Sequence, residues 1–477
     1  MKDKYDVIII GCGMGGLGSG IMLQTENSDL KTIIFEQHNI PGGYVTGFKR
    51  KGYYFDGGAE GITSVGENGL VKKALTELGI DYEFIPIEPL DVYYFDDKKF
   101  NFYLDKEKLI KEVKRVFPKH LDGFKEFLAE CDRIFQEISS GNKIPEYDNL
   151  CYLDLIGKFV PNDYIKDVFN LFCLWYGAKP SEMPGVFGAM VTRSVMNGGV
   201  YYPKGGMQEF SNMLRDTYTS RGGEVVFSTM VKKILIEDNK VIGVELENGK
   251  RIKCDWLISN ADIKRTILEY SGEKYFPKEY VDFIKNLKLT PSGFMLHLGV
   301  EMDLSNYPSH FQIGKDYAIL EKTSKGQFKL SKLAVRIPAN IDPDLKNGDN
   351  YSIVVFMFAP YDWKDYWLAG PEKDRGIKYK EYKEQVADEV ISIIEKVIPG
   401  LREKIAVKEL ATPLTFERYL QVTEGAWFGS HKFQKLPDSE TPIDNLLLVG
   451  ASVRGSGAPS ALNHGFTVGD ELAKKIS

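Results

Sequence analysis

Apolar residues follow one another almost without a break over residues 5–10, which is the pattern of a parallel strand covered on both faces. Glycines crowd the next six residues, and the sequence after them has the character of a helix. A second apolar run, residues 31–35, predicts another strand and ends at Glu36. The N-terminal pattern therefore predicts a β-α-β unit.

The middle of the chain has a different pattern. Residues 69–196 are rich in Lys, Glu, Phe and Tyr and predict mixed helices, with a hairpin over residues 93–104 around Asp96 and Asp97. Strand patterns return over residues 224–259 and again over residues 445–449. We therefore expect an α/β fold with a Rossmann-like domain that is discontinuous in sequence, joined to a second, α+β domain.

The first glycines have the spacing Gly11-x-Gly13-x-x-Gly16 between the predicted strand and helix. Gly11 permits a tight turn, Gly13 lets the backbone approach a pyrophosphate, and Gly16 permits close helix packing. Glu36 follows twenty residues after Gly16, where a carboxylate accepts hydrogen bonds from a ribose diol. This arrangement predicts a dinucleotide site, although the fingerprint alone does not distinguish NAD from FAD.

Length, net charge and cysteine content limit the number of domains, the partners and the cellular compartment that we expect. A chain of 477 residues exceeds what one core normally supports, so two domains are expected. The formal net charge of −6 gives no field that would hold a polyanion, and we expect no nucleic-acid partner. Five cysteines without C-x-x-C pairs favour a reducing cytoplasm. No apolar run reaches the roughly 18 residues of a membrane span, so any membrane contact would be peripheral.

Short motifs along nearly the whole chain resemble the FAD-dependent phytoene desaturase family, which includes carotenoid isomerases and retinol saturases within the amine-oxidase-like superfamily. The motifs that carry the resemblance are Pro41-Gly-Gly43, Gly52-Tyr-Tyr-Phe-Asp56-Gly-Gly, Tyr202-Pro-Lys-Gly-Gly-Met207, Ser259-Asn-Ala261, Thr412-Pro-Leu-Thr-Phe-Glu-Arg-Tyr419 and Leu448-Val-Gly-Ala-Ser452 with Gly455-Ser-Gly-Ala-Pro459. The resemblance implies one non-covalent FAD. No second fingerprint with its own acid appears, so a separate NADPH domain is not expected.

The resemblance also implies which residues approach FAD. Gly42 and Gly43 would lie against the ribose or ribityl side, and the C-terminal loop would lead into a helix aimed at the flavin. Ala451 stands where much of the wider class has an acid, which leaves the ribityl contacts to backbone or water. The cofactor-binding residues predicted in this way are Gly11, Gly13, Gly15, Gly16, Glu36, Gly42, Gly43, Gly57, Gly58, Ala59, Val231, Asn260, Gly450, Ala451, Ser452, Gly457 and Ala458.

We expect an FAD-binding domain from residues 1–70, 197–265 and 440–477 and a substrate-binding domain from residues 71–196 and 266–439. Two stretches in the second domain, residues 169–176 and 183–190, are rich in aromatic side chains and methionine. They predict either the lining of a long apolar tunnel, as the family implies, or ordinary core packing.

Candidate acids and bases are few. His464 lies in the last helix and is a candidate proton carrier, or a helix histidine bonded to a carbonyl. Arg454 is a candidate partner of flavin or substrate, or one half of an ion pair, and Glu417-Arg418 favours an internal salt bridge. The remaining histidines are too scattered to predict a metal site.

The combined prediction is an FAD-dependent oxidoreductase that transfers a hydride between flavin and a hydrophobic unsaturated substrate of isoprenoid, carotenoid or retinoid type. Desaturation, saturation and isomerisation remain open, with NAD(P)H or a quinone as a transient redox partner. A flavin amine oxidase and a non-catalytic prenyl-binding carrier of related fold are the alternatives. We expect a cytoplasmic protein with peripheral membrane contact.

Overall fold

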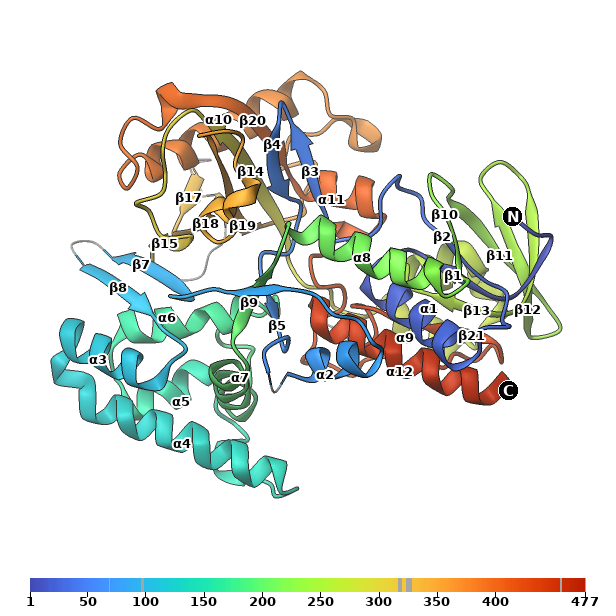
Figure 1. The fold of residues 1–477 in the computed structure, drawn as a ribbon, viewed down its shortest axis with the longest axis horizontal. Helices are drawn as coiled ribbons and strands as arrows, with labels where there is room; N and C mark the ends of the chain where they lie inside the picture. The colour runs from blue at the N-terminus through green and yellow to red at the C-terminus, as the bar shows by residue number, and fades with distance from the viewer. Residues whose placement is uncertain (68, 96–97, 316–319, 323–327, 455–456, 477) are drawn as a thin grey trace.

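The computed structural model describes residues 1–67, 69–95, 98–315, 320–322, 328–454 and 457–476. Two seven-stranded sheets form its centre, one in the right half of Figure 1 and one in the upper left half. A helical lobe lies at the lower left of the same view. Both chain ends lie beside the first sheet, so the N- and C-terminal segments meet there (Figure 1).

The first sheet has the strand order β10-β2-β1-β13-β12-β11, and β21 pairs with β13. β1 is parallel to β2 and to β13, and β21 is parallel to β13. The predicted β-α-β unit is confirmed as β1, α1 and β2. The bounds are β1 (Lys4–Ile10), α1 (Met14–Glu26), β2 (Thr32–Phe35), β10 (Glu224–Val226), β11 (Val231–Glu237), β12 (Lys240–Leu246), β13 (Arg251–Ser259) and β21 (Leu446–Leu448).

Burial explains the continuous apolar pattern of β1, because Val7, Ile8 and Ile9 are all fully buried between layers. α8 (Met207–Ser220) and α12 (Ala458–Ile476) pack against α1 on one face of this sheet (Figure 1). α1 and α12 approach closely because Gly18 lies opposite the backbone of Leu462, and a Cβ at Gly18 would be only 2.6 Å from the Leu462 carbonyl oxygen.

The second sheet has the order β20-β14-β19-β18-β15-β7-β8 and is antiparallel except between β15 and β7. The predicted hairpin is confirmed as β7 and β8, while its turn residues Asp96 and Asp97 lie outside the described residues. The bounds are β7 (Asp91–Phe95), β8 (Lys98–Phe102), β14 (Ser292–Val300), β15 (His310–Gly314), β18 (Lys332–Arg336), β19 (Tyr351–Ala359) and β20 (Ile405–Ala411). α10 (Ile377–Ile394) and α11 (Pro413–Leu420) belong to the same half.

Five helices build the lobe beside β7 and β8 (Figure 1). They are α3 (Lys106–Val116), α4 (Leu121–Ser139), α5 (Tyr152–Phe159), α6 (Asp163–Leu174) and α7 (Gly185–Gly198). Their apolar sides form one core, in which Phe127, Phe169 and Phe172 are buried and in mutual ring contact. The mixed helices expected in this part of the sequence are therefore confirmed.

Short elements connect the two halves. β3 (Gly47–Arg50) and β4 (Tyr53–Asp56) form a hairpin, and β9 (Val200–Pro203) pairs with β5 (Ile62–Thr63) and with β6 (Phe84–Pro86). β9 lies in the expected FAD-binding domain and β6 lies in the expected substrate-binding domain, so this small sheet crosses the expected boundary between them. The division into two domains stays a prediction. The other elements are α2 (Leu70–Glu77), α9 (Lys278–Lys285), β16 (Leu320–Lys322) and β17 (Phe328–Leu330).

Asp56 connects the motif of residues 52–58 with the motif of residues 202–207. Its buried carboxylate accepts hydrogen bonds from the hydroxyls of Tyr54 (2.8 Å) and Tyr202 (2.7 Å) and from the backbone N–H of Met207 (3.3 Å). Burial raises the pKa of this carboxyl to about 6. These bonds join the end of β4 to the start of α8, so both motifs hold the segment that leads to Gly57 and Gly58.

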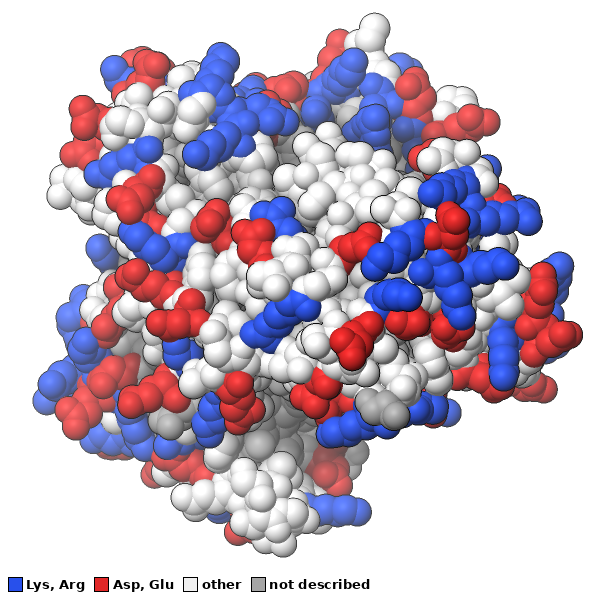
Figure 2. Space-filling model, turned by 45° about the vertical axis from the view of Figure 1, so that its right-hand side comes forward, with Lys and Arg blue, Asp and Glu red and all other residues white. Residues whose placement is uncertain are grey.

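The surface carries charges of both signs. On the face shown in Figure 2, Lys and Arg side chains are interspersed with Asp and Glu, so this face has no field of a single sign. Within the described residues we find no helix of the length and apolar character that crossing a bilayer requires.

Candidate FAD and substrate site

A group of glycines is here called the glycine cradle: Gly11, Gly13, Gly15 and Gly42 line the site, and Gly450 packs against Gly15 behind them. Gly13 and Gly42 form an isolated parallel bridge between the β1–α1 turn and the loop after β2. A Cβ at Gly13 would lie 2.9 Å from the Asn260 Nδ2, and one at Gly15 would lie 2.5 Å from the Asn260 Oδ1. The Asn260 side chain therefore occupies the space that a Cβ at Gly13 or Gly15 would need.

The backbone angles of the cradle also require glycine. Gly11 has φ +92°, Gly42 has φ +120° and Gly450 has φ +94°, which are values that L side chains rarely adopt. Gly450 lies near the start of the loop after β21, and a Cβ there would meet the same Asn260 amide as one at Gly15. The N-terminal fingerprint and the C-terminal loop, separated by more than 400 residues in sequence, thus face one another.

Glu36 stands at the end of β2, where the sequence pattern put an acid. Its Oε2 accepts from the Cys12 N–H at 2.7 Å, and its Oε1 accepts from the His38 N–H at 2.9 Å. Burial raises the pKa of this carboxyl, and the two backbone donors oppose that rise. Glu36 lines the same cavity as the glycine cradle, so its carboxylate can accept further hydrogen bonds from a ligand.

These residues fit FAD. The start of α1 presents free backbone N–H groups and the positive end of a helix dipole behind Gly11 and Gly13, which suits a pyrophosphate. Glu36 would hold the ribose diol, and the glycine cradle leaves room for the cofactor backbone where a Cβ would fill it. When bound, FAD supplies hydride transfer at its ring.

Most of the other predicted cofactor residues line the same cavity. They are Gly43, Gly58, Ala59, Val231, Asn260, Ala451, Ser452, Gly457 and Ala458. Gly16, Gly57 and Gly450 do not line it, and close packing explains them: a Cβ at Gly57 would lie 2.9 Å from the Thr46 Cγ2. These three glycines shape the loops without facing the cavity, so the geometry does not support a direct cofactor contact for them.

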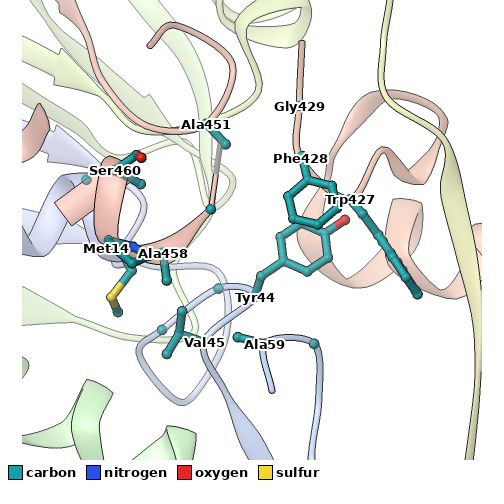
Figure 3. Close-up of a pocket in the computed structure, with 18 of the residues that line it drawn as sticks. Met14, Tyr44, Val45, Ala59, Trp427, Phe428, Gly429, Ala451, Ala458 and Ser460 are labelled. Atoms are coloured by element: carbon teal, nitrogen blue, oxygen red, sulfur yellow. The ribbon is translucent and has the colours of Figure 1, made fainter. Parts of the chain in front are cut away.

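The cavity has a volume of about 670 Å³ and continues from the glycine cradle into the second half of the molecule. Tyr44, Trp427 and Phe428 lie together on one side of it, opposite the ends of α1 and α12 (Figure 3). Ala59 and Ala451 project into the space between them (Figure 3). Small side chains thus keep the centre open while aromatic rings form a wall.

Residues from α6, α7 and the segment between them form a surface here called the apolar wall. It consists of Leu171, Leu174, Trp175, Tyr176, Phe187, Met190, Val191 and Val195. The tunnel interpretation is therefore confirmed for part of both stretches. Phe169, Phe172 and Met183 are buried away from the cavity, so for them the core-packing interpretation is correct.

The structure does not direct the His464 side chain toward the cavity, so the geometry does not support the proton-carrier role considered for it. Its Nε2 lies 2.8 Å from the Ser439 Oγ, and the side chain is not among the described residues that line the cavity. Burial, together with the nearby Arg454 charge, lowers the pKa of His464 to about 4. The neighbouring Asn463 lines the cavity instead, because one residue along a helix turns the side chain by about 100°.

Arg454 also lies outside the described lining. It is largely exposed and pairs with Asp438 at 3.3 Å, which is the ion-pair alternative. Glu417 pairs with Lys373 at 2.7 Å, as the salt-bridge interpretation of that motif predicts. In the described part of the chain, no group of three or more His, Cys, Asp and Glu side chains could hold a metal.

Four polar residues that line the cavity were missed from the sequence: the buried Asp91, His310 and Arg336 and the half-buried Glu60, here called the polar cluster. Arg336 donates from Nε to the Glu60 Oε2 at 3.0 Å and from Nη2 to the Asp91 Oδ2 at 3.1 Å. Glu60 follows the Gly57-Gly58-Ala59 segment directly, which is the local signal that could have found it. The other three come from β7, β15 and β18, which only the fold brings together.

Burial dominates the electrostatics of the polar cluster. It raises the pKa of Glu60 to about 8, although Arg336 opposes the rise, and it also raises the pKa of Asp91. The pKa of His310 is lowered well below its usual value because the ring is buried and Arg336 is close. Glu60 is therefore a mainly protonated carboxyl at neutral pH, and His310 is neutral.

Comparison with known proteins agrees with this site. The family model of flavin containing amine oxidoreductases matches residues 14–473. Prolycopene isomerase of Daucus carota is 29% identical over 94% of this chain and 76% of its own. The 4,4'-diapophytoene desaturase of Methylomonas sp is 25% identical, covering 96% and 93%, and the all-trans-retinol 13,14-reductase of Danio rerio is 22% identical, covering 100% and 87%.

Among solved structures, an oxidoreductase from Methanosarcina mazei superposes with a TM-score of 0.68 at 19% identity, covering 97% of this chain and 99% of its own. That likeness shows the α/β fold. The glycine cradle, Glu36 and the cavity supply the matching site, and the resemblance to the carotenoid and retinoid enzymes is confirmed by the relatives. The chain therefore belongs to the flavin-containing amine oxidoreductases and is an FAD-dependent oxidoreductase.

Proposed function

We propose that this enzyme transfers a hydride between FAD and an unsaturated, mainly apolar substrate of isoprenoid, carotenoid or retinoid type. The observation that carries the proposal is one continuous cavity that is lined both by glycines of the cradle and by the apolar wall. Desaturation, saturation and isomerisation all fit this layout. NAD(P)H or a quinone remains the proposed transient redox partner.

Different residues of the chain bind the cofactor and the substrate. The glycine cradle and Glu36 hold the cofactor, while the apolar wall removes water from a hydrocarbon substrate, at about 25 cal/mol for each Å² of apolar surface buried. Trp427 and Phe428 limit where the substrate can lie. Leu70 lines the cavity and is itself 68% exposed, so the cavity reaches the surface beside α2, where an apolar substrate would enter.

The alternatives are weaker. A carrier without redox chemistry needs no cofactor cradle, and the family match is to flavin oxidoreductases. The family name and the aromatic side chains Tyr44, Trp427 and Phe428 favour an amine oxidase. Against it, the Asp91 carboxylate in the cavity is already paired with Arg336 and does not offer a protonated amine an unpaired anion. Peripheral membrane contact and a cytoplasmic location stay predictions.

Stopped-flow spectroscopy tests the proposal. The FAD-loaded enzyme, photoreduced without oxygen or left oxidised, is mixed with polyene isoprenoids and, separately, with alkyl and aryl amines. We expect a flavin absorbance change together with a shift in the polyene spectrum. Reduction by amines with no response to any isoprenoid would overturn the proposal in favour of an amine oxidase, and purified protein without flavin would favour the carrier.

A further inference from the structure

A cavity made for a pure hydrocarbon has no use for ionisable side chains, because burying them is unfavourable unless they are paired. Yet the polar cluster lines the same cavity as the apolar wall. Asp91 is 1% exposed, His310 5% and Arg336 4%, so water does not solvate them. The cavity is therefore amphipathic.

The hydrogen bonds of the polar cluster are incomplete at one residue. Each nitrogen of Arg336 donates within the protein: Nε to Glu60, Nη2 to Asp91, and Nη1 to the Val335 carbonyl at 3.1 Å. Asp91 also accepts from the Gln312 Nε2 at 2.8 Å. Glu60 differs, because its Oε1 is buried and has no partner among the described residues. A buried carboxyl oxygen without a hydrogen-bond partner destabilises the fold unless a ligand supplies that partner.

We propose that Glu60 is the receptor for a neutral oxygen atom of the ligand, so that this enzyme binds an isoprenoid bearing a hydroxyl or carbonyl group in preference to the corresponding hydrocarbon. The inference rests on the proposed function and adds the polar group to its substrate class. The Glu60 carboxyl supplies the hydrogen bond, Arg336 holds that carboxyl in place, and the apolar wall receives the hydrocarbon chain.

Charge explains why the oxygen should be neutral. A ligand carboxylate would meet the carboxyls of Glu60 and Asp91, and the charge of Arg336 is already paired with the Asp91 carboxylate. Lys332, the other cation near Asp91, pairs with Asp167 at 2.9 Å. A protonated amine would meet the buried Arg336. Only an uncharged group adds a hydrogen bond without adding an unpaired charge.

Ligand binding to the FAD-loaded enzyme tests the inference without turnover. Quenching of tryptophan fluorescence is the readout, because Trp175 and Trp427 line the cavity. The probes share one polyene skeleton: all-trans-retinol, the hydrocarbon with hydrogen in place of its hydroxyl, the acid and the amine. We expect retinol to bind about 10-fold or more tightly than the hydrocarbon, which is the value of one hydrogen bond to a buried group.

Variants of Glu60 test whether its carboxyl causes the preference for alcohol over hydrocarbon. Glu60→Leu should reduce the preference for alcohol over hydrocarbon to about 2-fold, whereas Glu60→Gln, which can still donate, should keep it. Glu112→Gln is the matched control, because Glu112 is also buried and paired with an arginine, Arg115, but lies away from the cavity. The wild-type comparison stands even if Glu60→Leu fails to fold.

Equal binding of alcohol and hydrocarbon by the wild type would overturn the inference and leave the proposed function intact. Tighter binding of the acid or of the amine would overturn the neutral-oxygen assignment. If none of the four probes binds to flavin-loaded protein, the proposed apolar substrate itself is wrong, and the inference fails with it.

Discussion

At the scale of single residues, Gly13 shows how one added carbon can exclude the cofactor. A Cβ there would lie 2.9 Å from the Asn260 Nδ2, inside the space of the pyrophosphate approach. We expect Gly13→Val to lose bound flavin, measured as the ratio of flavin to protein absorbance after purification. Gly370→Val is the control, because a Cβ at Gly370 meets its neighbours only at 3.4 Å and beyond. Normal flavin content in Gly13→Val would contradict the placement.

Glu36 is expected to contribute hydrogen bonds to the affinity for FAD, whereas Gly13 leaves space for the cofactor. Glu36→Ala removes the carboxylate expected to hold the ribose, so the affinity for FAD should fall by roughly 1.5–3 kcal/mol. Titration of the apoprotein with FAD, followed by flavin fluorescence, measures the change. Glu26→Ala, at the exposed end of α1, should leave the dissociation constant unchanged. An unchanged value in Glu36→Ala would show that the ribose lies elsewhere.

Glu60 predicts a pH dependence of stability. Its pKa is about 8 in the folded protein, against about 4.3 for an unfolded Glu, so between these values the folded state holds one proton more. The free energy of unfolding should therefore fall as pH rises through this window, by at most about 1.4 kcal/mol per pH unit, and level off above pH 8.

Glu60→Gln tests this dependence, because it cannot ionise, while Asp91, His310 and Arg336 remain in both proteins. Urea denaturation at pH 5, 7 and 9 should show the variant gaining stability relative to wild type as pH rises. Parallel curves for the two proteins would mean that Glu60 is ionised throughout.

At the scale of elements, the contact between α1 and α12 brings both ends of the chain to the cofactor. A Cβ at Gly465 would clash with the Gly15 backbone carbonyl, and one at Gly469 would lie 2.7 Å from that of Ser19. Gly→Ala inside a helix normally stabilises by roughly 0.5–1 kcal/mol. We expect the opposite sign for Gly465→Ala, a loss of about 1–3 kcal/mol, because the helices must separate.

Thermal or urea unfolding measures this loss, and weaker flavin retention should accompany it, since Gly15 belongs to the glycine cradle. Gly198→Ala at the end of α7 is the control, because nothing lies within 4 Å of a Cβ there. Stabilisation of both variants would show that the α1–α12 contact has room for a methyl group.

At the scale of the whole molecule, the first sheet cannot be completed by the N-terminal part of the chain. β1 lies between β2 and β13, and β13 in turn pairs with β21 near the C-terminus. We expect a fragment of residues 1–190, expressed alone, to be insoluble or to lack flavin. Co-expression with residues 191–477 is the comparison that should restore yellow protein. A stable flavin-containing fragment would contradict this assembly.

Local sequence patterns predicted those site residues whose positions depend only on residues close to them in the sequence. The glycines of the β1–α1 turn and the acid twenty residues later need only a strand, a turn and a helix in order, so their spacing was sufficient. His464 shows the limit. Its place in a C-terminal helix was correct, but a rotation of about 100° per residue decides what a helical side chain faces, and that rotation is set by packing against other segments.

The sequence by itself determined that this chain binds a dinucleotide through a β-α-β unit and, by resemblance, that the dinucleotide is FAD. Only the tertiary structure decided which other side chains line the cavity beside the predicted cofactor-binding residues. Glu60, Asp91, His310 and Arg336 are separated by up to 276 positions in the chain, yet they form one polar cluster because β7, β15 and β18 are neighbours in one sheet. Burial then shifts their pKa values, and burial is a property of the folded chain, which no local pattern specifies.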